Sequence, residues 1–160
     1  MDYTKDYVLI LKESLERKIG ILKQLKEYND EQKKLCSAEH FDIEAYDVLV
    51  EKKSKLADDL ETIDGGFSSV YDRVSTELKE NKDKYSSDIA DMQRYIALIT
   101  DMIAGIQADE KRIFEMAKSK LDIKRKEVVA AKKSNQIAAN YYKSMSRTSV
   151  SDPQFMDKKK

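Results

Sequence analysis

Hydrophobic residues recur along this chain in steps of three and four, and the clearest such stripe lies in residues 89–117. Glu110 is its one polar interruption, and its apolar members are Ile89, Met92, Ile96, Ile99, Ile103, Ile106, Ile113 and Ala117. A helix places residues at these spacings on one narrow face, whereas a strand would divide them between two faces. The pattern therefore predicts a long helix with one face packed against partner helices.

Two further stripes of similar length precede it. The first consists of Val8, Leu11, Leu15, Leu22, Leu25, Asn29, Gln32 and Cys36, widened by Ile19 and Tyr28. The second consists of Tyr46, Leu49, Lys53, Leu56, Leu60, Ile63, Phe67, Val70 and Val74. Polar residues on such a face commonly fix the register of the helices, which is the role expected of Asn29 and Gln32. Lys53 is expected either to pair with a carboxylate or to extend to solvent.

The turns between these helices follow from the residues that flank them. Ser37 to Phe41 forms the first turn, and Asp42 is a plausible N-cap for the next helix. The second stripe keeps its phase through Gly65-Gly66, so we expect one continuous helix there and a turn near Asp83–Ser87. A turn at the glycine pair is the alternative, but it would leave helices of very unequal length.

These elements predict an all-α fold, an up-down-up three-helix antiparallel bundle of coiled-coil type. Residues 1–117 form the body, with helices at about 4–36, 42–81 and 88–117. Residues 118–146 contain no Gly or Pro, so the third helix is expected to extend beyond the bundle as a basic amphipathic arm. Residues 147–160 are Ser- and Lys-rich and are expected to be a disordered tail.

Charge is distributed unevenly although the formal net charge is zero. Residues 1–110 carry about 16 basic and 25 acidic side chains, whereas residues 111–147 carry about 11 basic and 3 acidic ones. The chain is thus an acidic body followed by a basic arm. The acidic start is unlike a secretory leader and the apolar runs are short, so we expect a soluble, cytoplasmic protein that does not enter a membrane.

The residue types that carry most catalytic and metal chemistry are scarce. Cys36 and His40 are the only residues of their kinds, which argues against a disulfide, a metal site or an imidazole-based catalytic centre. The glycine pair lacks the flanking strand of a phosphate-binding loop. We therefore expect no enzyme activity and no cofactor. Nucleic-acid binding is not expected either, because aromatic residues do not alternate with the basic ones.

The basic arm is the remaining functional signal, because its apolar stripe has no partner helix of matching length. A partner helix would contact Leu121, Val128, Val129, Ala131, Ile137, Ala138, Tyr141, Tyr142 and Met145. Tyrosines are frequent anchors at protein interfaces. The alternatives are that the arm pairs with itself in a homodimer of a structural coiled-coil protein, or that its lysines merely keep a lone helix in solution.

Three sequence features resemble the FlgN family of flagellar export chaperones. They are the turn and restart AEHFDIEAYDVLVEKKSKLADDLETID, the continuation DGGFSSVYDRVSTEL, and the ending KSNQIAANYYKSM after a basic helix. The resemblance implies a cytoplasmic type III export chaperone that holds hook–filament junction proteins by their C-terminal amphipathic helices. It also implies client contact through the arm residues named above, in a monomer or weak dimer.

The same resemblance implies a contact with a component of the export gate. A C-terminal tyrosine serves this purpose in the family, and either Tyr141 or Tyr142 matches its position. The FliT-like chaperones of the filament cap are a sister family of helical bundles, and they stay open as an alternative.

Overall fold

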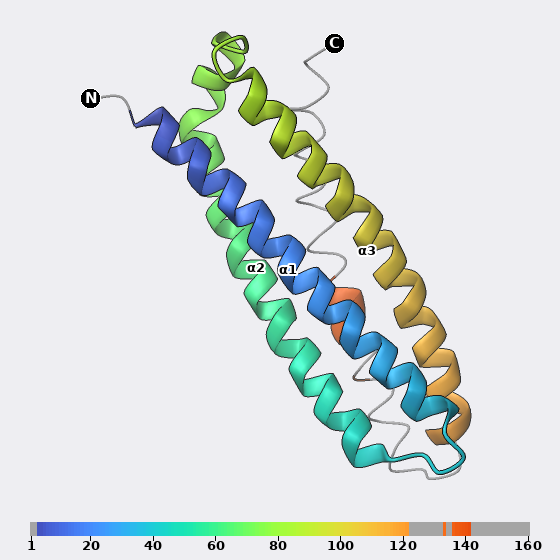
Figure 1. Cartoon of the computed structure of the whole chain (residues 1–160). Helices are drawn as coiled ribbons and strands as arrows, with labels where there is room; N and C mark the ends of the chain where they lie inside the picture. Colours follow the sequence, from blue (N-terminus) through green and yellow to red (C-terminus); the bar gives the residue numbers. More distant parts are fainter. Residues whose placement is uncertain (1–2, 122–132, 134–135, 142–160) are drawn as a thin grey trace.

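The computed structural model of this chain describes residues 3–121, 133 and 136–141, and the described residues include three long helices. Helix α1 spans Thr4–Ser37, α2 spans Ile43–Glu80 and α3 spans Ser86–Leu121. Each helix reverses the direction of the one before it (Figure 1). The predicted all-α, up-down-up antiparallel bundle is therefore confirmed for these three helices.

Helix α1 is the central element, because it packs against both α2 and α3. No Cα atom of α2 lies within 8 Å of one in α3, so these two helices are held apart although their side chains meet. The predicted stripes form the core: their members are buried except Tyr28, Leu56 and Val70, which are partly buried. Leu56 and Val70 pack against the main hydrophobic cluster. The third stripe is buried along its whole length, including Glu110.

The first turn ends where the sequence predicts the second helix to begin. The carboxylate of Asp42 accepts a hydrogen bond from the backbone N–H of Ala45 at 3.0 Å, which caps the N-terminus of α2. Beside this turn, the ring of Phe41 packs against that of Tyr46, which is buried. The predicted cap at Asp42 is therefore confirmed.

Helix α2 runs without interruption through Gly65 and Gly66, as expected from the phase of its stripe. It ends at Glu80, and residues 81–85 form the turn that leads into α3. Tyr85 is buried, and its carbonyl accepts a hydrogen bond from the backbone N–H of Ile89 at 2.9 Å. This turn overlaps the predicted position near Asp83–Ser87, so the alternative of a turn at the glycine pair is wrong.

Buried and half-buried ion pairs connect α1 to both of its neighbours. Lys18 pairs with Asp64 of α2 at 2.8 Å, and Lys12 pairs with Asp91 of α3 at 3.0 Å. Asp109 of α3 accepts hydrogen bonds from two lysines of α1, Lys26 and Lys33. Because burying either partner alone is costly, these pairs disfavour other registers of the helices.

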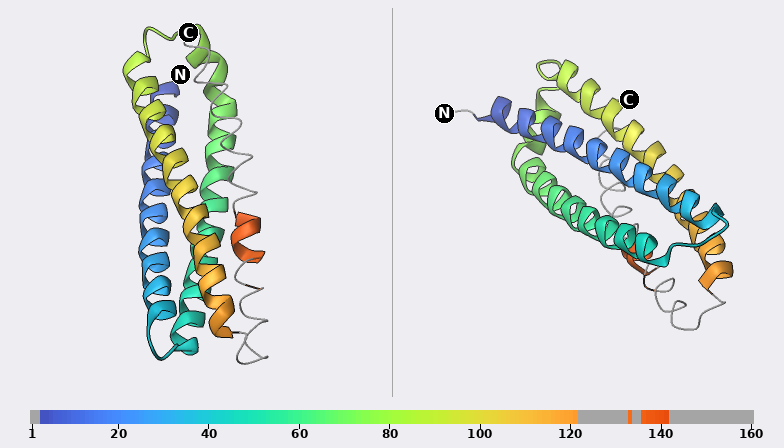
Figure 2. Two further views of the ribbon diagram at one scale, coloured as in Figure 1. Left: turned by 90° about the vertical axis from the view of Figure 1, so that its right-hand side faces the viewer. Right: turned by 60° about the horizontal axis from the view of Figure 1, so that its bottom comes forward.

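Residues 136–141 do not project beyond the bundle as the sequence predicts. They form a helical segment that lies alongside α2 and α3 (Figure 2), and Ala138 and Tyr141 are buried there. The physical reason is that α2 and α3 leave room between them, so the apolar side chains of this segment leave water by packing in that space. The prediction of an arm extending past the body is thus corrected at these residues.

Candidate functional site

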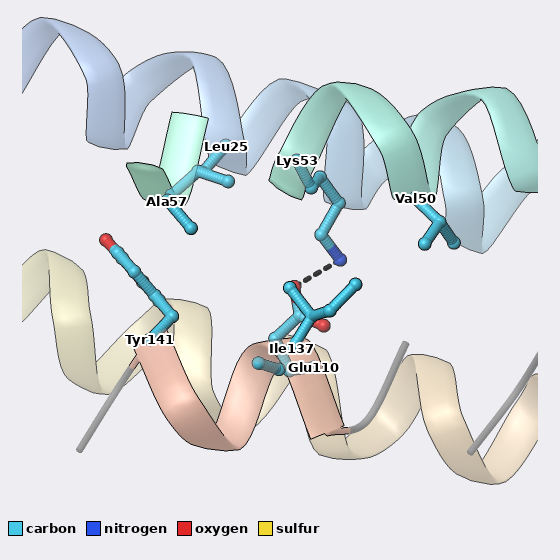
Figure 3. A pocket seen from close by; sticks show the side chains of 8 residues that line it. Leu25, Val50, Lys53, Ala57, Glu110, Ile137 and Tyr141 are labelled. Carbon is cyan, nitrogen blue, oxygen red and sulfur yellow. Dashed lines mark ion pairs between the residues drawn. The ribbon is translucent and has the colours of Figure 1, made fainter. Parts of the chain in front are cut away.

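The space between α2 and α3 is the candidate site, and we call it the α2/α3 groove. Its floor and walls come from all three helices, from Leu25 in α1, from Val50, Lys53 and Ala57 in α2, and from Glu110 in α3. Residues 136–141, which we call the C-terminal segment, close it (Figure 3). A small cavity of about 20 Å³ remains between the segment and these residues, about enough for one water molecule.

The C-terminal segment points its apolar side chains into the groove. Ile137 and Tyr141 extend from the segment toward α1 and α2 in Figure 3. Tyr141 belongs to the main hydrophobic cluster and is 7% exposed, while Ala138 is 9% exposed. Ile137 packs against a second cluster, which contains Cys36, Tyr46, Val50, Ile113, Ala117 and Leu121. The segment therefore occupies the position of a fourth helix on a three-helix body.

The segment runs in the same direction as α2. Lys133, just before it, lies 3.7 Å from the carboxylate of Glu51, and Tyr141 at its end lies beside Leu60 and Asp64. Since α3 is antiparallel to α2, the segment is antiparallel to α3 as well. The three helices and the segment therefore alternate in direction along the chain, as in an up-down-up-down bundle.

The floor of the groove is polar where Lys53 and Glu110 lie. Lys53 of α2 forms an ion pair with Glu110 of α3, and its ammonium group donates a hydrogen bond to Gln32 of α1 at 2.9 Å. Burial lowers the pKa of Lys53, and the charge of Glu110 offsets only part of this effect. The sequence left two roles open for Lys53, and the structure selects pairing with a carboxylate. One side chain thereby joins all three helices beneath the segment.

Burial also affects the tyrosine that enters the groove. It raises the pKa of Tyr141 far above its usual value, and the nearby charges of Asp64 and Glu110 raise it further. The phenol therefore stays protonated and neutral at any physiological pH.

One edge of the groove is acidic. Glu51, Asp58 and Glu61 of α2 are exposed at intervals of seven and three residues, so they share one face of the helix. Asp58 and Glu61 line a polar hollow next to the segment, together with Ser54, Leu60, Asp64, Ile137, Asn140 and Tyr141. We call Glu51, Asp58 and Glu61 the acidic edge.

The structure places four of the nine predicted contact residues. Leu121 is buried at the end of α3 in the second hydrophobic cluster, and Ile137 packs against the same cluster. Ala138 and Tyr141 face the α2/α3 groove. Val128, Val129, Ala131, Tyr142 and Met145 lie outside the described residues, so the structure brings together only the first four.

Sequence reasoning missed the groove itself. It identified Glu110 as an interruption of one apolar stripe and expected a carboxylate partner or solvent for Lys53 on another, but it did not connect the two residues. Their presence on two different stripes was the available signal, because two buried opposite charges are stable only as a pair. The spacing of the acidic edge was visible too, but a solvated helix face has the same pattern.

A metal-binding cluster and a membrane-spanning helix are both absent from the described part of the chain. Residues 3–121, 133 and 136–141 contain no group of three His, Cys, Asp or Glu side chains placed to hold a metal ion. None of the helices described combines the length and the apolar character that crossing a bilayer requires. Cys36 is buried, and burial raises the pKa of its thiol.

Comparisons of the chain with protein-family models, with curated proteins and with solved structures find no match.

Proposed function

We propose that this protein binds an amphipathic helix of a partner protein, as an export chaperone of the FlgN type does. The observation that carries the proposal is the arrangement of the helices. Helices α2 and α3 stand apart, and a short helical segment completes the bundle between them. A C-terminal segment that packs as a fourth helix against this body is suited to pack against a helix of another chain with the same side chains.

The proposed clients are hook–filament junction proteins, held in the cytoplasm before export. Their terminal amphipathic helices carry an apolar face that would assemble too early. The arm residues, from Leu121 to Met145, supply the apolar stripe that covers this face. An acidic client helix suits the basic arm, because opposite charges favour the encounter and disfavour wrong partners. No catalytic step and no cofactor are part of this role.

Client binding through Leu121, Ala138 and Tyr141 requires these side chains to leave their present contacts, since Leu121 is buried in the second hydrophobic cluster and the other two are buried in the groove. The ion pair that the structure describes at this end, between Lys133 and Glu51, lies at the surface, with both side chains more than 60% exposed. Such a pair contributes about 0–1 kcal/mol, so it adds little to the cost of release. The protein therefore exchanges between two states, one with the segment packed in the groove and one with the segment bound to the client, and client binding favours the second.

The experiment is capture of a junction subunit by purified protein carrying Val128→Asp and Tyr142→Asp. We expect capture to be abolished and the circular dichroism of the three-helix body to be retained, because charges on the arm stripe prevent its apolar contact. The matched control carries Val48→Asp and Leu98→Asp, two exposed apolar residues on the body, and should capture normally.

Undiminished capture by the arm variant would overturn the arm as the client site. Light scattering on the unmodified protein at micromolar concentration tests the alternative of a structural homodimer. A stable dimer that dissociates in the arm variant would favour that alternative over the chaperone role.

A further inference from the structure

The buried apolar residues of the bundle fall into two clusters along its length. The main hydrophobic cluster includes buried residues of α1 from Val8 to Leu25 and of α3 from Ile89 to Ile106. The second hydrophobic cluster lies at the end of the body where the chain turns from α1 into α2. Its buried members are Cys36, Tyr46, Val50, Ile113, Ala117 and Leu121. The two clusters therefore occupy successive parts of the same three helices.

A layer of buried polar side chains separates the two clusters. It consists of Asn29 and Gln32 of α1, Lys53 of α2 and Glu110 of α3, and we call these four residues the polar layer. Both amide atoms of Asn29 and the amide nitrogen of Gln32 have no hydrogen-bond partner among the described residues. Because these groups gain hydrogen bonds to water when the layer opens, the layer joins the two clusters less firmly than apolar side chains would.

The C-terminal segment makes apolar contacts on both sides of the polar layer. Its Ile137 packs against the second cluster, whereas its Tyr141 belongs to the main cluster. Both side chains line the small cavity beside Lys53 and Glu110 (Figure 3). The segment therefore spans the layer, and it holds the second cluster to the main one while it stays in the groove.

The second cluster is the smaller of the two. Among the described residues it has six buried members, against eighteen in the main cluster. Opening it exposes less apolar surface, so opening this end costs less free energy than unfolding the main cluster. The cluster also lies beside the first turn and the end of α3 at Leu121, so it can open without breaking the helices of the main cluster.

We propose that the end of the body beyond the polar layer, residues 33–50 and 113–121, opens as a unit while the main cluster stays folded. The C-terminal segment is the latch that keeps this end closed, and its departure from the groove raises the population of the open form. Opening frees Leu121, the residue at which α3 ends. The inference goes beyond the proposed function and does not depend on it, because it concerns the chain without a partner.

Cys36 reports on this opening, because it is buried in the second cluster. Its reaction with a disulfide reagent at pH 8 follows the population of the open form when closing is faster than labelling. Ile113→Ala removes apolar contacts of the second cluster and should speed labelling about tenfold or more. The matched control is Ile99→Ala, in the main cluster of the same helix. It should lower the urea midpoint as well but leave the labelling rate within about twofold.

A milder pair keeps the test decisive if an alanine variant does not fold. Ile113→Val should speed labelling of Cys36 by about two- to tenfold, whereas Ile99→Val should leave it unchanged.

The latch is tested by Tyr141→Ala, which removes the contact of the segment with the main cluster. Labelling of Cys36 should become about threefold faster or more. The control is Tyr7→Ala, which truncates a tyrosine that packs against the main cluster at the opposite end of the body. This variant should leave the labelling rate within about twofold.

Hydrogen exchange measured by mass spectrometry shows whether a whole unit opens or only the last turn of α1. The backbone amides of residues 47–50 and 113–117 should exchange about tenfold faster or more than those of residues 63–74 and 92–106. Exchange of all these amides at the same rate would show that the body opens only as a whole.

Three results would overturn the proposal. Equal acceleration by Ile113→Ala and Ile99→Ala would mean that the two clusters unfold together. Unchanged labelling in Tyr141→Ala would exclude the latch. Exchange of residues 113–117 as slow as that of residues 92–106 would confine the opening to the end of α1. Capture of a junction subunit is measured separately, so a failure here leaves the chaperone role standing.

Discussion

The ammonium group of Lys53 in α2 forms an ion pair with the carboxylate of Glu110 in α3, beneath the segment that closes the α2/α3 groove. Both side chains are less than 10% exposed. Water therefore screens this pair far less than a pair at the surface. It also spans the two helices whose backbones stay apart, so it is the main polar link across the groove in the described part of the chain.

We expect Glu110→Ala to lower the free energy of unfolding by about 3–5 kcal/mol, because it leaves the charge of Lys53 buried without a counter-ion. Urea unfolding followed by circular dichroism measures the change. Glu115→Ala, at an exposed position five residues further along α3, is the control and should change the value by less than about 0.5 kcal/mol. A double replacement, Lys53→Met with Glu110→Leu, should recover most of the loss. An unchanged urea midpoint in Glu110→Ala would contradict the pairing.

Asn29 is expected to reduce the stability of the core. It is 0% exposed, and its amide has no hydrogen-bond partner among the described residues. Replacing it with leucine removes the cost of burying this amide, so Asn29→Leu should raise the free energy of unfolding by about 1–3 kcal/mol. The measurement is the urea midpoint, and the control is Asn29→Ala, which removes the amide but leaves a void. Loss of stability in Asn29→Leu would show that the amide is satisfied or that the site has no room.

The glycine pair in α2 offers a second route to higher stability. A methyl group added at Gly65 or Gly66 would meet no atom within 4 Å beyond its chain neighbours and the adjacent backbone of α2, and both residues lie in regular helix. Each replacement by alanine should therefore stabilise the protein by about 0.5–1 kcal/mol, because alanine restricts the unfolded chain and favours helix. Thermal and urea unfolding of the single and double variants give the values. A fall in midpoint would indicate that α2 needs to bend at this point.

The ion pairs of Asp109 are expected to make the free energy of unfolding fall at low pH. Its burial raises the pKa, but the hydrogen bonds from Lys33 and Lys26 outweigh burial and hold the pKa below the usual 3.8. A carboxyl group whose pKa is lower in the folded than in the unfolded protein stabilises the folded state at pH values above its pKa in the unfolded chain. This stabilisation is lost as the pH falls through its pKa in the folded protein. Asp109→Asn should thus cost about 1.5–3 kcal/mol at pH 7.

The pH profile separates this effect from general acid unfolding. The difference in unfolding free energy between the unmodified protein and Asp109→Asn should be constant from pH 7 to about 5 and shrink below pH 4. Asp101→Asn, at an exposed residue of the same helix, is the matched control and should show no such change. A difference that stays constant down to pH 3 would exclude the proposed role of Asp109.

Cys36 should react slowly with thiol reagents in the folded protein. The residue is 3% exposed, and burial raises its pKa above the usual 9.0, so little thiolate is present at neutral pH. We expect its reaction with a disulfide reagent at pH 8 to be at least 100-fold slower than that of the urea-unfolded chain. A rate close to that of the unfolded chain would mean that this end of the bundle opens readily.

The sequence predicted most of the body correctly because each of its features depends on neighbouring residues. The stripes set which face of each helix is buried, the carboxylate of Asp42 caps α2, and the unbroken phase across Gly65 and Gly66 predicts a continuous helix. These are local effects of helix geometry and capping, so no knowledge of the partner helix is needed to infer them.

The candidate site was only partly predicted, since it depends on residues that are distant in the chain. The sequence indicated that Ile137, Ala138 and Tyr141 form an apolar stripe, but it did not indicate that α2 and α3 leave room for them. In the same way it marked Lys53 and Glu110 as exceptions without joining them. A periodic pattern determines which side chains avoid water. Only the tertiary structure decides what covers them, because that depends on the distances between helices, which no stretch of the chain encodes alone.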